Sequence, residues 1–155
     1  MTDRKAELLR LEDQAWAEFR SLIDGLTDEQ LGMDGYYPEW SVKDLMAHYA
    51  SWMAESARML EQIRLGSYTA WDQDVDACNA DWYASWRELN LGAVKAHLHA
   101  SRARMLEEWD GLSPDHVDGP ATEWFRDSGI DHNDDHVPRL REWVVELRGG
   151  PQGRR

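Results

Sequence analysis

The sequence predicts an all-α protein folded as an antiparallel four-helix bundle. Apolar residues recur at intervals of three and four residues in several long segments, which is the spacing of one helical face. Alternating runs of β-branched residues, which would indicate strands, are missing. The composition does not change abruptly along the 155 residues, so we expect one domain over residues 1–148 and a flexible tail over residues 149–155.

Two helices are expected in the first half of the chain. The first runs from about Asp3 to Leu26, and its apolar stripe comprises Leu8, Leu11, Ala15, Trp16, Phe19, Leu22 and Ile23. The loop GMDGYYPEW, residues 32–40, carries two glycines and a proline and separates it from the second helix. Ser41 is a favourable N-cap for that helix, Asp44 completes a capping-box pattern, and Gly66 is expected to end it.

The second half of the chain begins with a long connector, SYTAWDQDVDACNADWYASWRELN, at residues 67–90. We expect a crossover with a short helix near residues 74–87, folded over one end of the bundle. Connections of this length are often functional lids, although a packed structural connection explains the segment equally well. A third helix is expected over residues 91–112. The last is expected over residues 121–147, disturbed near Gly129 and Pro138.

Charge and composition exclude several classes of function. The net charge of −13 disfavours direct binding to nucleic acid or to anionic lipid, because both are negatively charged. Neither a signal-peptide pattern nor a run of about eighteen apolar residues occurs, so no membrane association is expected. The single cysteine, Cys78, fits a reducing, cytoplasmic location. The nine tryptophans suit core packing, and also a pocket for a flat small molecule.

Two histidines stand on the predicted apolar face of the last helix. At 100° per residue, His132 and His136 lie about 40° apart, within the stripe that also contains Phe125, Leu140 and Trp143. Burying an imidazole without a partner is costly, because its donor and acceptor both lose water. A shared metal ion or hydrogen bonds to neighbouring polar groups would each offset that cost, and the spacing alone does not decide between them.

A metal site would need a third ligand from another helix. The remaining histidines are His48, His97, His99 and His116. His116 falls in a loop and His99 points away from the apolar stripe of its helix, so both are poor candidates. The helical wheel favours His48 only slightly over His97.

Two segments resemble motifs of the DinB-like superfamily. WSVKDLMAHYASW, residues 40–52, resembles the second-helix motif, in which W-(S/T)-V-K-D leads into a helix that carries one histidine. DHNDDHVPRLREW, residues 131–143, is similar to the last-helix motif, HxxxH followed by an apolar residue, proline and a helix ending in tryptophan. The ClbS/DfsB branch fits best, because its members also carry a long connector containing Asp and Asn.

The resemblance implies a four-helix bundle that holds a divalent metal ion, commonly zinc or nickel, on three histidines. These correspond here to His48, His132 and His136. Asn133 departs from the motif, since many relatives have tyrosine there; the change would affect the surroundings of the site and not coordination itself. Relatives often pair, so a homodimer is also compatible with the resemblance.

The implied function is that of a metal-dependent enzyme that hydrolyses or otherwise inactivates a reactive small molecule with a metal-bound water, in detoxification or self-protection. One alternative is an S-transferase that depends on a thiol such as mycothiol or bacillithiol. Another is a non-catalytic protein that binds and sequesters a small molecule between Trp71, Trp82 and Trp86. No catalytic acid or base can be assigned, because Glu55 and Asp44, which flank His48, are explained more simply as solvated carboxylates.

Overall fold

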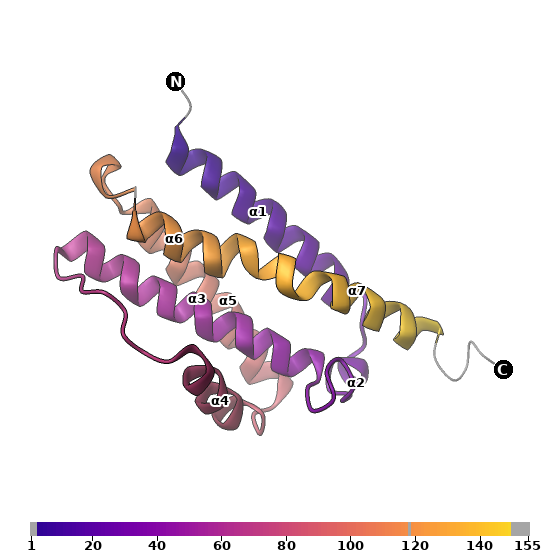
Figure 1. Cartoon of the computed structure of the whole chain (residues 1–155). Helices are drawn as coiled ribbons and strands as arrows, with labels where there is room; N and C mark the ends of the chain where they lie inside the picture. The colour runs from indigo at the N-terminus through magenta and orange to yellow at the C-terminus, as the bar shows by residue number, and fades with distance from the viewer. Residues whose placement is uncertain (1–2, 118, 150–155) are drawn as a thin grey trace.

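The computed structural model describes residues 3–117 and 119–149, where four long helical segments form a bundle (Figure 1). These are α1 (Arg4–Ile23), α3 (Val42–Leu65), α5 (Leu91–Asp110) and a continuous segment made of α6 (Pro120–Arg126), the π-helical turn η2 (Asp127–Asp131) and α7 (His132–Gly149). The shorter elements are α2 (Asp28–Leu31), α4 (Val75–Trp86) and the 3-10 turn η1 (Pro114–His116). The all-α bundle predicted from the apolar periodicity is therefore confirmed.

The connector makes α3 and α5 run in the same direction. At the start of the pair, Lys43 donates hydrogen bonds to the carbonyl oxygens of Arg87 and Leu89, which precede α5. At the other end, Arg64 forms an ion pair with Glu108, with 2.9 Å between Nε and Oε2. The connector thus returns the chain along the bundle and places α4 beside α3.

The other two long segments, α1 and α6–η2–α7, run opposite to α3 and α5 (Figure 1). Two contacts show that they are parallel to each other. Glu12 packs near Gly129, and farther along both segments Glu18 forms an ion pair with Arg141, with 2.6 Å between Oε2 and Nη2. The bundle therefore consists of two parallel pairs that are antiparallel to each other.

The helix ends follow local capping signals in the sequence. Ser41 and Asp44 form the predicted capping box of α3, and Gly66 ends this helix in the left-handed conformation with φ 76°. Asp74 caps α4 and Asn90 caps α5, each through a side-chain oxygen that accepts a backbone N–H. The boundaries of α3, α4 and α5 consequently lie within two residues of those predicted.

The core lies between the four long segments and is largely apolar. Its fully buried large side chains are Leu8, Phe19, Tyr36, Leu45, Met46, Tyr49, Met53, Leu60, Leu98, Met105, Trp109 and Phe125. One charged residue is also fully buried: Glu12 of α1 accepts two hydrogen bonds from Arg102 of α5, at 2.7 and 2.8 Å. Two such charge-assisted bonds satisfy a carboxylate that would otherwise be costly to bury.

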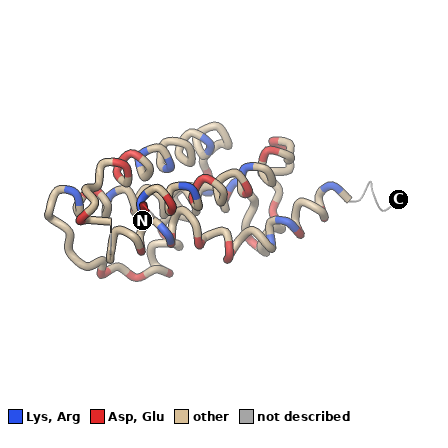
Figure 2. The backbone as a smooth tube through the Cα atoms, turned by 90° about the horizontal axis from the view of Figure 1, so that it is seen from above, with Lys and Arg blue, Asp and Glu red and all other residues tan. Residues whose placement is uncertain are grey.

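The structure differs from the predicted elements in a few places. α1 ends at Ile23 and not near Leu26, because the chain turns there and then forms α2, which the periodicity does not predict. Gly149 belongs to α7, and the rest of the predicted tail lies outside the described residues. Acidic and basic residues are interspersed along the helices (Figure 2), and no helix in the described part of the chain is long and apolar enough to cross a membrane.

Candidate metal centre and its pocket

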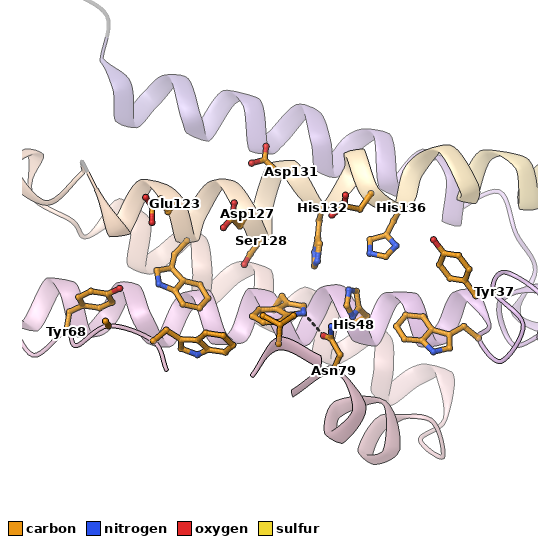
Figure 3. Close-up of a pocket in the computed structure, with 17 residues that line it drawn as sticks. Tyr37, His48, Tyr68, Asn79, Glu123, Asp127, Ser128, Asp131, His132 and His136 are labelled. Carbon is orange, nitrogen blue, oxygen red and sulfur yellow. Dashed lines mark hydrogen bonds between the residues drawn. The ribbon is translucent and has the colours of Figure 1, made fainter. Parts of the chain in front are cut away.

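Three histidines from two helices meet on one side of the bundle. His48 lies on α3, while His132 and His136 lie one turn apart at the start of α7 (Figure 3). One nitrogen of each ring lies within 4.8 Å of the corresponding nitrogen of the other two. The structure thus brings together the three histidines expected from the DinB-like motifs, and His48, not His97, lies beside His132 and His136.

The other histidines lie elsewhere. His97 stacks on Trp86, with 3.9 Å between ring centroids, and His99 packs edge-on against Trp16. His116 is exposed in η1. None of these three joins the cluster of His48, His132 and His136, which we call the histidine cluster.

The rings of the histidine cluster are held in the neutral form by their surroundings. Burial, and after it the neighbouring His136, lowers the pKa of His48 to about 3. Burial, followed by the two other histidines, likewise lowers the pKa of His132 to about 3. Burial also lowers the pKa of His136. Neutral imidazoles keep a lone pair available, which is the form that coordinates metal ions.

Tyr36 fixes the orientation of His136. Its hydroxyl lies 3.1 Å from Nδ1 of His136 and 3.3 Å from the carbonyl oxygen of the same residue. The single hydroxyl group serves both contacts if Tyr36 donates its proton to the carbonyl oxygen and its oxygen accepts from Nδ1–H. In that tautomer Nε2 of His136 carries the free lone pair.

The loop that carries Tyr36 is itself tied to α7. Arg139 donates hydrogen bonds to the carbonyl oxygens of Tyr36 (2.6 Å) and Gly35 (2.9 Å). Gly35 has φ 123°, and a side chain there would meet the ring of Trp143. The loop therefore needs glycine at this position, both for its backbone conformation and for its close approach to α7.

His132 is packed between aromatic rings, and one of its nitrogens has no hydrogen-bond partner in the part of the chain that the structure describes. Tyr49 stacks against it with 4.8 Å between centroids. Asn133 in turn accepts a hydrogen bond from the Tyr49 hydroxyl and donates one to the carbonyl of Ala15. Asn133, which departs from the family motif, thus contributes to the hydrogen bonds that hold Tyr49 against His132. It does not line the pocket.

The residues present fit a divalent ion. Nδ1 of His132 is buried and has no partner among the described residues, which is unusual for a ring nitrogen in a protein interior. Three neutral nitrogen donors on two packed helices form the kind of ligand set that zinc accepts while keeping a further position open.

A pocket of ≈ 890 Å³ opens in front of the histidine cluster. Its walls come from α3, from the connector and α4, and from the segment α6–η2–α7 (Figure 3). Aromatic rings dominate, namely Tyr37, Trp40, Trp52, Tyr68, Trp71 and Trp124. The connector closes one side through side-chain hydrogen bonds from Trp52 to Asn79 and from Trp71 to Glu55, both 2.8 Å. It therefore forms a wall of the pocket.

The π-helical turn η2 aligns the pocket-lining residues of the last bundle segment. These fall in two series with four-residue spacing, at positions 123, 127, 131, 135 and 124, 128, 132, 136. In a regular α-helix four residues exceed one turn by about 40°, so such series would drift around the helix. A π-turn has more residues per turn than an α-helix, so within it four residues turn through less than 360°. This shortfall offsets part of the drift in the flanking α-helices and keeps both series on the pocket side.

The disturbance predicted near Gly129 is thus confirmed, whereas Pro138 lies inside α7 without ending it. The turn also corrects the regular helical wheel. Phe125, placed by the wheel beside the histidines, stacks on Trp109 in the core instead, with 4.2 Å between centroids. The histidines themselves are only half-buried at the pocket wall.

Other residues considered from the sequence have structural partners. Asp44 is committed to the capping box of α3, and Glu55 binds Arg58 and Trp71. Trp82 and Trp86 do not line the large pocket, so of the three tryptophans proposed as a clamp only Trp71 does.

Sequence reasoning missed Tyr36 and the pocket carboxylates of α6 and η2. The Tyr36 loop offers no periodic signal. Asp127, Asp131 and Asp135, however, follow one another at four-residue intervals, and this repeat could have indicated a row of carboxylates on one side of the helix.

Comparison with known proteins places the chain in a family. Residues 13–146 match the family described as "Mycothiol maleylpyruvate isomerase N-terminal domain". No functionally curated protein matches the sequence. A crystal structure of an uncharacterised protein from Escherichia coli UTI89 is similar, with a TM-score of 0.76 and 18% identity over 93% of this chain and 94% of that one. At this identity the likeness shows the fold alone, and closeness to the ClbS/DfsB branch stays a prediction. The chain belongs to the mycothiol maleylpyruvate isomerase N-terminal domain family, within the DinB-like superfamily.

Proposed function

We propose that this protein is a metal-dependent enzyme that inactivates a reactive small molecule, with His48, His132 and His136 as the metal ligands. The observation that carries the proposal is the convergence of three neutral imidazoles on the wall of a pocket large enough for a small organic substrate. When bound there, a divalent ion such as zinc or nickel would supply Lewis acidity, activating a nucleophile or polarising an electrophile.

The protein's own residues position the proposed ligands and the substrate. Tyr36 holds the ring of His136, and Tyr49 holds that of His132. The aromatic walls offer flat surfaces against which an apolar substrate can be oriented. We assign no general acid or base, because Asp44 and Glu55 are engaged with other partners.

Hydrolysis is the first form of the reaction that we propose, because a pocket open to solvent can admit water to the histidine cluster. A thiol-dependent transferase is the second candidate, and the family match favours it, since the family description names mycothiol. Cys78 does not line the pocket, so a thiol nucleophile would have to enter as a co-substrate. A non-catalytic sequestering protein is the third candidate, supported by the aromatic walls alone.

The metal site is tested by titrating metal-free protein with zinc or nickel and comparing His136→Ala with His116→Ala. His116 is exposed and outside the cluster, so its variant controls for the loss of any one histidine. We expect one equivalent of metal in the parent and in His116→Ala, and loss of tight binding in His136→Ala. Stoichiometric metal that persists in a folded His136→Ala variant would refute the ligand set.

The reaction is tested by presenting the metal-loaded protein with electrophilic small molecules, with and without added thiol. A hydrolase consumes an epoxide or lactone in water alone, whereas a transferase needs the thiol. Binding without turnover under either condition would favour sequestration and contradict the enzymatic proposal.

A further inference from the structure

We propose that the pocket selects a positively charged organic molecule with a flat apolar body, such as a protonated aromatic amine. This names the substrate class for the reaction proposed above and rests on that proposal for its chemistry. The selection of charge itself is a property of the pocket walls.

One wall carries a row of carboxylates. Glu123, Asp127, Asp131 and Asp135 occupy every fourth position along α6, η2 and α7, and all four line the pocket (Figure 3 labels the first three). Among the described residues, no lysine or arginine lines it. A negatively charged substrate would therefore meet repulsion with no lysine or arginine on the walls to compensate it.

Two arginines that could offset this row, Arg126 and Arg58, do not neutralise it. Arg126 lies 3.8 Å from Asp131, which offsets one of the four charges in part. Arg58 is engaged with Glu55, at 2.7 Å. Within the described part of the chain, Glu123, Asp127 and Asp135 form no ion pair, so three carboxylates remain for a ligand.

The potential at the row is negative enough to affect its own members. Burial raises the pKa of Asp127, and the neighbouring Asp131 and Glu123 raise it further, against a smaller opposing effect of Arg126. A cation placed beside these carboxylates would relieve their mutual repulsion. The carboxylates thus have an energetic reason to prefer a positive ligand.

Three indole rings of the pocket can accept a cation or a flat body. Trp52 lies 5.6 Å from Trp71 and 6.5 Å from Trp124 between ring centroids, and Trp71 lies 5.7 Å from Trp124. The indole N–H groups of Trp52 and Trp71 are tied to Asn79 and Glu55. Fixed indole rings can recognise organic ammonium groups through cation–π contacts, and here they line the same pocket as the carboxylates.

The histidine end of the pocket also carries an unpartnered polar atom. His132 lines the pocket, and its buried Nδ1 has no partner among the described residues. Asp127 precedes His132 by five residues, roughly 7 Å along the helix axis. A cationic group held at Asp127 would therefore leave the rest of a molecule of drug-like length beside the histidine cluster.

The experiment compares three ligands that share an indole ring and differ in charge: tryptamine, tryptophol and indole-3-acetate. Their binding to the full-length, metal-free protein is measured by calorimetry near neutral pH at low salt. We expect tryptamine to bind most tightly and indole-3-acetate most weakly. Each carboxylate should contribute roughly three- to ten-fold to the affinity for tryptamine, and added salt should reduce the preference.

The matched variants are Glu123→Gln/Asp127→Asn and Glu107→Gln/Asp134→Asn. Both remove two negative charges from exposed helical positions, but Glu107 and Asp134 lie outside the pocket. Tryptamine affinity should fall at least ten-fold in the first variant and stay close to the parent value in the second. Tryptophol affinity should change little in either variant.

Equal affinities for the three ligands would overturn the inference, as would undetectable tryptamine binding or equal losses in the two variants. Because the measurement uses metal-free protein, its result is separate from the metal titration. Metal binding without a preference for tryptamine would refute this inference and leave the proposed function standing. A tryptamine preference without metal binding would refute the proposed function alone.

Discussion

Replacing Tyr36 with phenylalanine tests whether the histidine cluster is held in a metal-ready arrangement by its surroundings. The hydroxyl contacts both Nδ1 and the carbonyl oxygen of His136, so Tyr36→Phe removes two contacts at once. The phenylalanine ring fills the same fully buried space, so packing is otherwise preserved.

The expected losses of stability and of metal affinity follow from the hydrogen bonds that His136 loses in Tyr36→Phe. Nδ1–H of His136 loses its acceptor in a half-buried position, which costs about 1–2 kcal/mol of folding free energy. The ring is also released from the orientation that aims Nε2 at its neighbours. Removing a hydrogen-bond partner of a metal-binding histidine typically weakens metal affinity by about 10- to 100-fold.

The assay is a zinc titration against a chelator of known affinity, with urea unfolding of the metal-free protein measured in parallel. Tyr37→Phe is the matched control, because Tyr37 is the adjacent tyrosine, is 41% exposed and makes no hydrogen bond to the cluster. Zinc affinity in Tyr36→Phe equal to that in Tyr37→Phe would show that the Tyr36 hydroxyl does not position His136 and would refute the reasoning.

Three further outcomes are expected, each measured by urea unfolding of metal-free protein. Gly35→Ala should lose roughly 2 kcal/mol, because alanine is strained at φ 123° and its Cβ would overlap the ring of Trp143; unchanged stability would contradict that geometry. Arg102→Met should lower the free energy of unfolding by about 3–5 kcal/mol, because it leaves Glu12 buried and unpaired, and Glu12→Gln/Arg102→Met should recover most of that loss. A double variant that is no more stable than Arg102→Met would argue against the ion pair. The free energy of unfolding should fall as the pH drops below about 6.5, because His48 and His132 take up protons in the unfolded chain but not in the folded protein, where their pKa values are about 3. At pH 5 the expected loss is roughly 2 kcal/mol for each histidine. A stability that does not change from pH 7 to pH 5 would contradict the lowered pKa values.

The helix boundaries could be predicted because their signals are local. Ser41 and Asp44 are three residues apart and bond to each other's backbone, and Gly66 adopts the left-handed conformation its position suggests. His132 and His136 could be paired for the same reason, since they lie on one helix one turn apart. The motif resemblance then supplied His48, which the helical wheel alone could not separate from His97.

Other features depend on contacts between distant parts of the chain, and no local pattern encodes them. Tyr36 reaches His136 across one hundred positions, through a loop that Arg139 holds in place. Glu12 would be assigned to a polar helix face, and only its meeting with Arg102, ninety positions away, makes it a buried residue. Such pairings appear only once the helices are placed against one another.

The π-helical turn η2 also affects how this protein can change through insertions and deletions. Five residues in a π-turn cover about the same rotation as four in an α-helix, so the loss of one residue from Asp127–Asp131 can be absorbed by a return to regular helical geometry. The loss of one residue from a regular α-helix would instead turn everything that follows by about 100°. The turn is therefore the place in this segment where the chain can lose one residue while His132 and His136 keep facing His48.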